Sequence, residues 1–246
     1  MIKDSFIFGV HPILEALQKG EEIDKILIQS GLRNDHLHNI IRLAKKLDIY
    51  IQYVPIEKLN RQTRKNHQGI IAMMSLVEYQ KIENLLPLIY EKGETPFILV
   101  LDRITDIRNI GAIARTAECT GVHAILVPAQ NSAKINAEAV KSSAGAILRI
   151  PIARSYNLKN DLVLLKESGL QIIGVSEKTN TNYTTNDYKL PTALIMGSEE
   201  DGVSEEYLKL CNSYAKIPMV GNIASLNVSA AAAVVLYEAL NQKLNA

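Results

Sequence analysis

Hydrophobic positions along residues 1–75 alternate between strand-like runs and helical spacing. Uninterrupted apolar runs are typical of strands, whereas apolar residues three and four positions apart mark one face of a helix. The expected strands cover 26–28, 49–54 and 69–74, and Pro12 stands at the expected first position of a helix. Helical spacing recurs at Leu37, Ile40, Ile41, Ala44 and Leu47. The pattern predicts a small α/β domain.

The same alternation continues to residue 246. The strand-like runs there are continuous rather than alternating in polarity, and they cover 96–102, 124–128, 148–152, 170–176, 192–197 and 214–219. Such runs are typical of strands covered by helices on both faces, as in parallel sheets. Residues 76–96 between the two parts are charged and contain Gly93 and Pro96 near their end. We therefore predict an α/β domain over 1–75, a linker with a short helix over 76–96, and a largely parallel α/β domain over 97–246.

One long stretch, from residue 217 to residue 237, contains no charged residue. Its 21 residues match the length of a membrane-spanning helix. Pro218, Gly221 and Asn222 lie in its first half, where they argue against a continuous lipid-facing helix. We expect a loop followed by a buried helix, and no association with a membrane.

Charge and cysteine content narrow the class of protein. The 246 residues hold 27 Lys and Arg against 26 Asp and Glu, a net charge of +1, which excludes a disordered polyelectrolyte and a nucleic-acid binder that relies on bulk positive charge. The excess of basic residues lies in 1–75, with 11 basic and 8 acidic residues. Cys119 and Cys211 form no CxxC pair, and the apolar run after Lys3 and Asp4 is too short for a signal-peptide core. A cytoplasmic location is expected.

Several common sites are excluded by spacing. No two glycines stand a single residue apart, so the dinucleotide-binding fingerprint is missing from the sequence. Gly197 and Gly202 have the spacing of a phosphate loop, but Val203 stands in place of the lysine and three carboxylates lie between them. The five histidines have no zinc-ligand spacing. We expect no metal site.

Three segments combine strand ends, glycines and polar residues. In the first, 101–122, Asn109 is positioned to cap a helix, and Gly111 permits close approach of a phosphate or another backbone. Arg115 follows Asn109 by six residues, about 240° around a helix, so the two need not share a face. A capped helix with a solvated arginine gives the same pattern.

The other two segments lie near the C-terminus. Residues 193–204 lead a buried strand into a glycine-bounded acidic turn with Glu199, which suits an adenine or a ribose but also an acidic hairpin or capping loop. Residues 217–233 place Ser225 and Asn227 before an apolar helix, where Ser225 alone would be interpreted as an N-cap.

Together and in this order, the segments resemble the three motifs of the SpoU (TrmH) family of S-adenosylmethionine-dependent RNA ribose 2′-O-methyltransferases. The matching residues are Asn109, Gly111 and Arg115 in NIGAIARTA, Gly197, Glu199 and Gly202 in MGSEEDG, and Ser225 and Asn227 in SLNVS. One position departs from the family, because Ile107 follows Asp106 where the family has proline. GVHPILEAL and NHQGIIAMM resemble the substrate-binding domain, similar to α/β/α ribosomal proteins, of the branch that methylates a guanosine of large-subunit ribosomal RNA.

The resemblance implies a C-terminal α/β-knot domain, in which a deep trefoil knot forms the S-adenosylmethionine pocket and a homodimer forms through the knotted domain. It implies a pocket lined by Met196, Gly197, Ile217, Met219, Ser225 and Leu226. It assigns the chemistry to Arg115, with Asn109, Glu199, Ser225 and Asn227 as hydrogen-bonding partners. Because arginine is a poor general base at neutral pH, we expect Arg115 to orient a substrate phosphate and stabilise the alkoxide.

RNA binding is expected in the first domain, where RQTRKNH places Arg61, Arg64 and Lys65 beside His67. A solvated loop would give the same pattern. Two alternatives remain open: a transfer-RNA 2′-O-methyltransferase, and a non-catalytic RNA-binding or ribosome-assembly protein. The extra domain favours ribosomal RNA, and the joint presence of the motif residues favours an enzyme.

Overall fold

The computed structural model describes residues 6–33, 36–47 and 49–245. By its internal contacts the chain divides into two compact units, Met1–Glu78 and Tyr79–Ala246. Lys3 and Asp4 lie outside the described residues. Both cysteines are free thiols, with Cys119 exposed and Cys211 half-buried.

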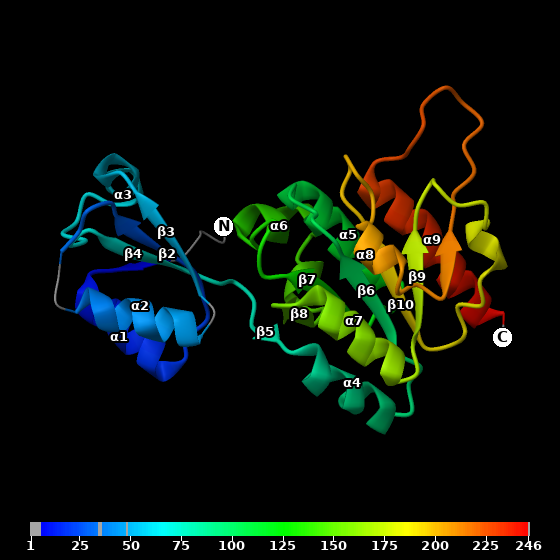
Figure 1. Ribbon diagram of the computed structural model, residues 1–246, viewed down its shortest axis with the longest axis horizontal. Helices are drawn as coiled ribbons and strands as arrows, with labels where there is room; N and C mark the ends of the chain where they lie inside the picture. The colour runs from blue at the N-terminus through cyan, green and yellow to red at the C-terminus, as the bar shows by residue number, and fades with distance from the viewer. Residues whose placement is uncertain (1–5, 34–35, 48, 246) are drawn as a thin grey trace. The chain divides into compact units, whose positions relative to one another are not determined.

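The first unit is a four-stranded mixed sheet with helices on both faces (Figure 1). Its elements are β1 (Phe6–Phe8), α1 (Val10–Lys19), β2 (Ile23–Gln29), α2 (Leu37–Lys46), β3 (Tyr50–Val54), α3 (Ile56–Gln62) and β4 (Ile70–Met74). The strand order is β1-β4-β2-β3, with β2 and β3 parallel and the other pairs antiparallel. Because side chains alternate along a strand, Ile26 and Ile28 pack toward α1 and α2, whereas Leu27 packs with Leu59 of α3.

Strands β2 to β4 and helices α1 and α2 form where the hydrophobic pattern predicts them. Strand β1 is not expected from the sequence, because its three residues are too few to show a period. Pro12 is the third residue of α1 rather than the first. The first four N–H groups of a helix have no intrahelical acceptor, so a proline there removes no hydrogen bond.

The second unit is built on a seven-stranded sheet in the order β11-β9-β10-β6-β7-β8-β5, in which all described pairs are parallel. The strands are β5 (Tyr79–Gln80), β6 (Phe97–Leu101), β7 (Ala124–Pro128), β8 (Ile152–Ser155), β9 (Gln171–Val175), β10 (Thr192–Met196) and β11 (Ser213–Ala215). The expected parallel sheet is confirmed. β6 and β10 are buried along their whole length, which is why their apolar runs are continuous.

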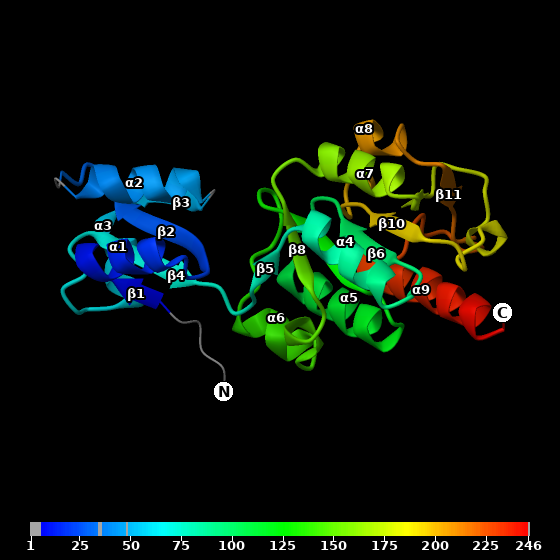
Figure 2. The ribbon, with the colours of Figure 1, turned by 90° about the horizontal axis from the view of Figure 1, so that it is seen from below.

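Helices cover both faces of this sheet (Figure 2). They are α4 (Ile82–Glu91), α5 (Ile107–Cys119), α6 (Ala137–Ser142), α7 (Leu158–Glu167), α8 (Glu205–Leu208) and α9 (Val228–Leu244), with short 3-10 turns at Ala146–Leu148 and Tyr183–Thr185. α4 and α7 pack on one face, and α5 and α9 pack together on the other. A Cβ atom on Gly111 would overlap Ser142, so this glycine lets α6 lie against α5.

The second unit differs from the sequence expectation in three places. Residues 79–96, expected as part of a linker over 76–96, belong to the second unit, because α4 buries Ile82, Leu85, Leu86 and Ile89 in its core. The run 148–152 is a strand only at Ile152, and the run 214–219 only at its first two residues. Pro151 and Pro218 lack the N–H that a central strand donates, so each marks an end of pairing.

The uncharged stretch from 217 to 237 forms a loop followed by α9, as expected. The helix buries Val228, Ala232, Val235, Leu236 and Ala239. Within the described residues, no helix combines the length and the apolar character that a membrane span requires.

Candidate active site

The three polar segments of the second unit meet at the carboxyl ends of its central strands. Strands β7 and β8 lie in sequence on one side of β6. Strands β9 and β10 lie on its other side, with β10 between β9 and β6. The strand order therefore reverses between β6 and β10. In parallel sheets, ligand sites form outside the carboxyl ends of the strands at such a point.

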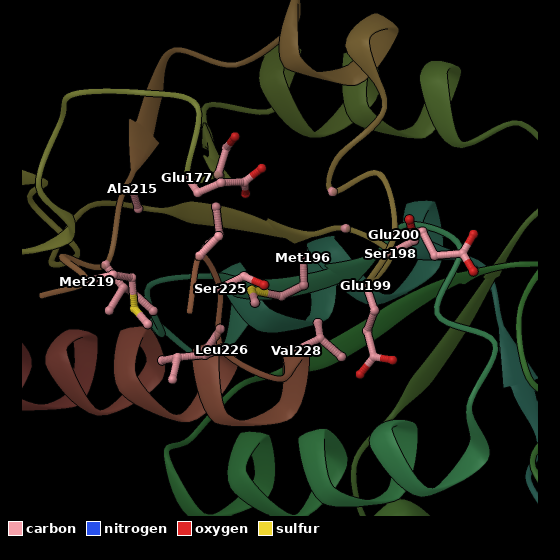
Figure 3. A pocket seen from close by; sticks show the side chains of 17 residues that line it. Glu177, Met196, Ser198, Glu199, Glu200, Ala215, Met219, Ser225, Leu226 and Val228 are labelled. Atoms are coloured by element: carbon pink, nitrogen blue, oxygen red, sulfur yellow. The ribbon is translucent and has the colours of Figure 1, made fainter. Parts of the chain in front are cut away.

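A pocket opens at this edge of the sheet (Figure 3). Its walls come from the ends of β9, β10 and β11, the turn after β10, the loop before α9 and the start of α9. All six residues expected to contact the cofactor line it: Met196, Gly197, Ile217, Met219, Ser225 and Leu226. Sequence reasoning missed Ser176 and Glu177, which lie just after β9 and also line the pocket. Their position directly after an apolar strand could have indicated them as pocket residues.

One carboxylate joins the three segments. Oε1 of Glu199 accepts hydrogen bonds from Nδ2 of Asn109 and from Nδ2 of Asn227, each over 2.7 Å. Asn227 Nδ2 also donates to Oδ1 of Asn109 over 3.1 Å. The side chain of Asn109 is buried, and Glu199 faces the pocket. The cluster therefore holds the acidic turn and the loop before α9 against α5.

Helix capping differs from the sequence expectation at both helices. Asp106, not Asn109, caps α5 by accepting a hydrogen bond from the backbone N–H of Arg108 over 2.8 Å. This bond, followed by the Arg108 guanidinium, holds the pKa of the Asp106 carboxyl below its usual range. Ile107 is the first helical residue, where proline is favoured, and Asp106 fixes the helix start without it. Asn227, not Ser225, caps α9 through the N–H of Ser229.

The acidic turn folds tightly onto its own start. Ser198 and Gly202 exchange two backbone hydrogen bonds of 3.1 and 3.0 Å. A Cβ atom on Gly197 would overlap the backbone of Gly202 and Val203. Gly202 has a φ of 73°, which favours glycine. The five-residue glycine spacing thus reflects a closed turn rather than a phosphate loop.

An ion pair between the buried Asp102 and the half-buried Arg103, which sequence reasoning missed, fixes the other end of this turn. Asp102, only 1% exposed, accepts hydrogen bonds from the N–H and the hydroxyl of Ser204 over 2.8 and 2.7 Å. Arg103 donates to Asp102, to Asp201 and to the Gly202 carbonyl over 3.0 to 3.1 Å. Hydrogen bonding to Asp102 raises the pKa of Arg103. Arg103 adopts a φ of 57°, a conformation that is strained for a side chain of its kind.

Arg115 lies apart from this cluster. It is exposed on α5 and does not line the pocket, whereas Asn109 is buried on another face of the same helix. Asn109 and Arg115 therefore lie on different faces of α5, as their spacing in the sequence allowed. The structure brings Asn109, Glu199, Ser225 and Asn227 to the pocket and its rim, and leaves Arg115 open to solvent.

The basic loop of the first unit divides into two kinds of residue. Arg61, Arg64 and Lys65 are exposed. His67, which was expected to contact RNA, is 7% exposed. Its Nδ1 accepts a hydrogen bond from the N–H of Gly69 over 3.0 Å, so Nε2 carries the hydrogen and donates to Oδ1 of Asn60 over 2.9 Å. Through these two hydrogen bonds, His67 holds the loop in place.

The chemistry of the pocket suits a ligand with a neutral, weakly polar part and a cationic centre. Apolar side chains, including Met196, Ile217 and Leu226, form most of the wall. Glu177, Glu199 and Glu200 supply carboxylates, and no Lys or Arg is among the described lining residues. Figure 3 shows Glu199 and Glu200 pointing in different directions from the same turn. S-adenosylmethionine, with its adenosine and sulfonium, fits this donor set. No metal-binding cluster of three or more His, Cys, Asp or Glu residues occurs in the part of the chain that is described.

Comparison with protein families agrees with this geometry. Residues 96–237 match the SpoU rRNA Methylase family, and residues 6–80 match the family described as RNA 2′-O ribose methyltransferase substrate binding. YacO from Bacillus subtilis (strain 168), assigned to the TrmH family of tRNA/rRNA methyltransferases, is 34% identical over 238 residues, 97% of this chain and 96% of that protein. A relative from Staphylococcus aureus (strain MSSA476) with the same assignment is 35% identical over 242 residues, 98% of each chain.

Solved structures show the same fold. The SpoU methyltransferase AviRb from Streptomyces viridochromogenes, in complex with AdoMet, matches with a TM-score of 0.63 and 24% identity over 99% of this chain and 92% of that chain. A TrmH/SpoU tRNA modifying enzyme from A. aeolicus matches with a TM-score of 0.57 and 31% identity over 66% of this chain and 84% of that chain. The chain belongs to the SpoU/TrmH family of RNA methyltransferases, whose cofactor is S-adenosylmethionine.

Proposed function

We propose that this protein methylates a ribose 2′-OH in RNA, and that the target is a guanosine of large-subunit ribosomal RNA. The observation that carries the proposal is the cluster of Asn109, Glu199 and Asn227, which joins all three motifs at the rim of the pocket. The match of residues 6–80 to a substrate-binding family described by its 2′-O ribose chemistry supports the ribose as acceptor. That extra unit also favours ribosomal RNA.

Transfer RNA is the second candidate substrate. The A. aeolicus protein, which is similar over 66% of this chain, is a tRNA modifying enzyme, and YacO is assigned to a family of tRNA/rRNA methyltransferases. A non-catalytic RNA-binding or assembly role is disfavoured, because a chain without activity has no need for a hydrogen-bonded cluster built around a pocket.

In the proposed reaction, bound S-adenosylmethionine supplies an activated methyl group. Glu199, Asn109 and Asn227 hold the walls of the pocket in position, and Ser225 lies in the same wall. Positioning of this kind lowers the barrier by pre-aligning the reacting atoms. Arg115 is proposed to orient a phosphate of the RNA, which its exposure permits, and to stabilise the developing alkoxide. It is not assigned as the general base, because its guanidinium is charged at neutral pH.

We also propose that residues of the second unit form a deep trefoil knot and that two copies associate through it in the cytoplasm. Membership of the SpoU/TrmH family supports the knot. Exposed apolar side chains support a subunit contact: Val220 and Ile223 in the loop before α9, and Tyr237 and Leu244 on α9. Size-exclusion chromatography with light scattering gives the oligomeric state.

One experiment tests substrate and activity together. The protein is incubated with labelled S-adenosylmethionine and separate ribosomal and transfer RNA pools, and 2′-O-methyl sites are then mapped. We expect label in ribosomal RNA at one guanosine; label in transfer RNA alone would select the second candidate, and no label would reject the enzyme. Arg115→Ala is expected to abolish transfer while calorimetry still detects cofactor binding. Wild-type turnover in Arg115→Ala would remove this residue from the mechanism.

A second experiment tests the basic loop. Charge reversal at Arg61, Arg64 and Lys65 is expected to weaken RNA binding and to flatten its dependence on salt, because fewer counterions are released from the phosphates. A salt dependence equal to that of the wild type would reject this loop as a phosphate contact.

A further inference from the structure

One face of the first unit's sheet carries a row of side chains that crosses all four strands. The strand registers place Phe6 opposite Met73, Met73 opposite Lys25, and Lys25 opposite Tyr50. Paired positions on neighbouring strands point to the same face. We call these four residues, Phe6, Met73, Lys25 and Tyr50, the cross-strand row.

Helix α3 lies on the same face but reaches a different part of it. Two residues further along the strands, Leu27 and Ile71 are 2% and 0% exposed, because Leu59 of α3 packs on them. The cross-strand row lies at the margin of this cluster, where Phe6 and Met73 pack against it but are only partly buried. Tyr50 is 49% exposed, and Phe6, Lys25 and Met73 are half-buried.

We propose that the cross-strand row is a platform on which bases of single-stranded RNA stack. The proposal rests on the proposed function, since it names how that substrate is held. An aromatic ring stacks on any base, and aromatic residues presented on an open sheet face are a recurring solution for single-stranded RNA. Tyr50 and Phe6 supply the rings at the two ends of the row, and Met73 supplies an apolar contact between them.

Charge favours RNA over an apolar protein partner for this face. Lys25 stands in the middle of the row, so an apolar protein surface seated there would desolvate its ammonium group without a counter-charge. A backbone phosphate provides that counter-charge. The first 75 residues also hold 11 basic and 8 acidic residues, and α3 is followed by the exposed Arg64 and Lys65, which are suited to neighbouring phosphates.

The chain contains no tryptophan, so a single introduced indole reports on one position. Tyr50→Trp places this probe in the row. The matched control is Tyr53→Trp on the same strand: Tyr53 is 58% exposed, but it is opposite Ile28, which packs toward α1 and α2, so it belongs to the other face. The full-length protein is titrated with an oligouridylate of about 12 nucleotides, within the usual site size for single strands. Stacking is expected to quench the fluorescence of Trp at position 50 and to leave that of Trp at position 53 unchanged.

Binding measurements with the same oligonucleotide complete the test. Tyr50→Ala is expected to weaken binding about tenfold, the usual range for loss of one stacked base, and Tyr53→Ala to bind as the wild type. Lys25→Gln, which leaves the rings in place, is expected to weaken binding and reduce its salt dependence. Equal quenching at both positions, quenching at neither, or unchanged affinity in Tyr50→Ala would overturn the platform. Methylation by the wild type is scored separately, so its absence would reject the enzyme while quenching at position 50 still supported the platform.

Discussion

Asn227 donates a hydrogen bond from Nδ2 to Oε1 of Glu199 over 2.7 Å, although the two residues belong to different segments. Asn109 donates to the same oxygen over 2.7 Å. One carboxylate oxygen therefore fixes the acidic turn, the start of α9 and the first turn of α5 relative to one another. The wall of the cofactor pocket depends on this junction.

Replacing Glu199 by alanine is expected to destabilise the fold and weaken cofactor binding. The substitution leaves the buried Asn109 amide without its acceptor, which costs about 1–3 kcal/mol. In a chain of this size the melting temperature should fall by several degrees. Glu200→Ala, on the same exposed turn, is the control and should melt as the wild type. An unchanged melting temperature and cofactor affinity in Glu199→Ala would show that the junction contributes nothing.

Gly197→Ala should disrupt the pocket. Its Cβ atom would overlap the backbone of Gly202 and Val203, so the closed turn must open. Overpacking of this kind typically costs about 1–3 kcal/mol. We expect loss of S-adenosylmethionine binding by calorimetry and a lower melting temperature. Gly221→Ala is the matched control, because no atom lies within 4 Å of its added Cβ, and it should bind cofactor normally. Normal binding in Gly197→Ala would contradict the tight turn.

Arg103→Gly tests whether the contacts of the guanidinium support the cofactor pocket. Glycine relieves the left-handed φ of 57° but removes the bonds to Asp102, Asp201 and the Gly202 carbonyl. We expect cofactor affinity to fall about tenfold, the equivalent of roughly 1.4 kcal/mol. The melting temperature should also fall, because the buried Asp102 carboxylate loses its counter-charge and relief of the strained φ offsets only part of that cost. Ala144→Gly, at a φ of 51° and without a polar side chain, should leave affinity unchanged. Equal affinity in both variants would limit Arg103 to a structural role.

His123 should make the fold less stable in mild acid. Burial lowers its pKa below the ordinary 6.5, although the nearby Glu94 carboxylate acts in the opposite direction. Its Nδ1 accepts a hydrogen bond from the N–H of Phe97 over 3.0 Å, which requires that nitrogen to be unprotonated. Well above pH 6.5 the histidine is neutral in both states, and its contribution to stability does not change with pH. As the pH falls below 6.5, the unfolded chain takes up the proton more readily than the folded one, so stability is lost.

Urea denaturation at pH 7.5 and pH 5 measures this effect. His123→Asn keeps an acceptor but does not titrate, so it should lose less stability between the two pH values than the wild type. His38→Asn, an exposed site on α2, should behave as the wild type. A pH dependence in His123→Asn equal to that of the wild type would assign the acid sensitivity to other groups.

Much of the fold was predictable from local pattern. The runs that became β6, β7, β9 and β10 are continuous because helices cover both faces of the sheet, and this burial appears in the sequence as apolar residues without interruption. Short elements were not predictable in this way. Strands β1 and β5 contain three and two residues, and the apolar residues of α4 give no indication of which core they join.

The residues of the candidate site were also predictable only where they belong to a local motif. The resemblance of three short motifs identified the six pocket residues, from Met196 to Leu226, because each motif keeps its chemistry within a few positions. The sequence left open whether Asn109 and Arg115 converge, and it gave no sign that His67 is buried or that Asp102 and Arg103 hold the acidic turn. Asp102, just after β6, accepts a hydrogen bond from Ser204, which follows the neighbouring strand β10 and is 102 positions away in the sequence. Hydrophobic periodicity shows only which faces of a segment are buried. Which distant polar groups form a hydrogen bond is decided by the tertiary structure, because a buried donor needs an acceptor nearby.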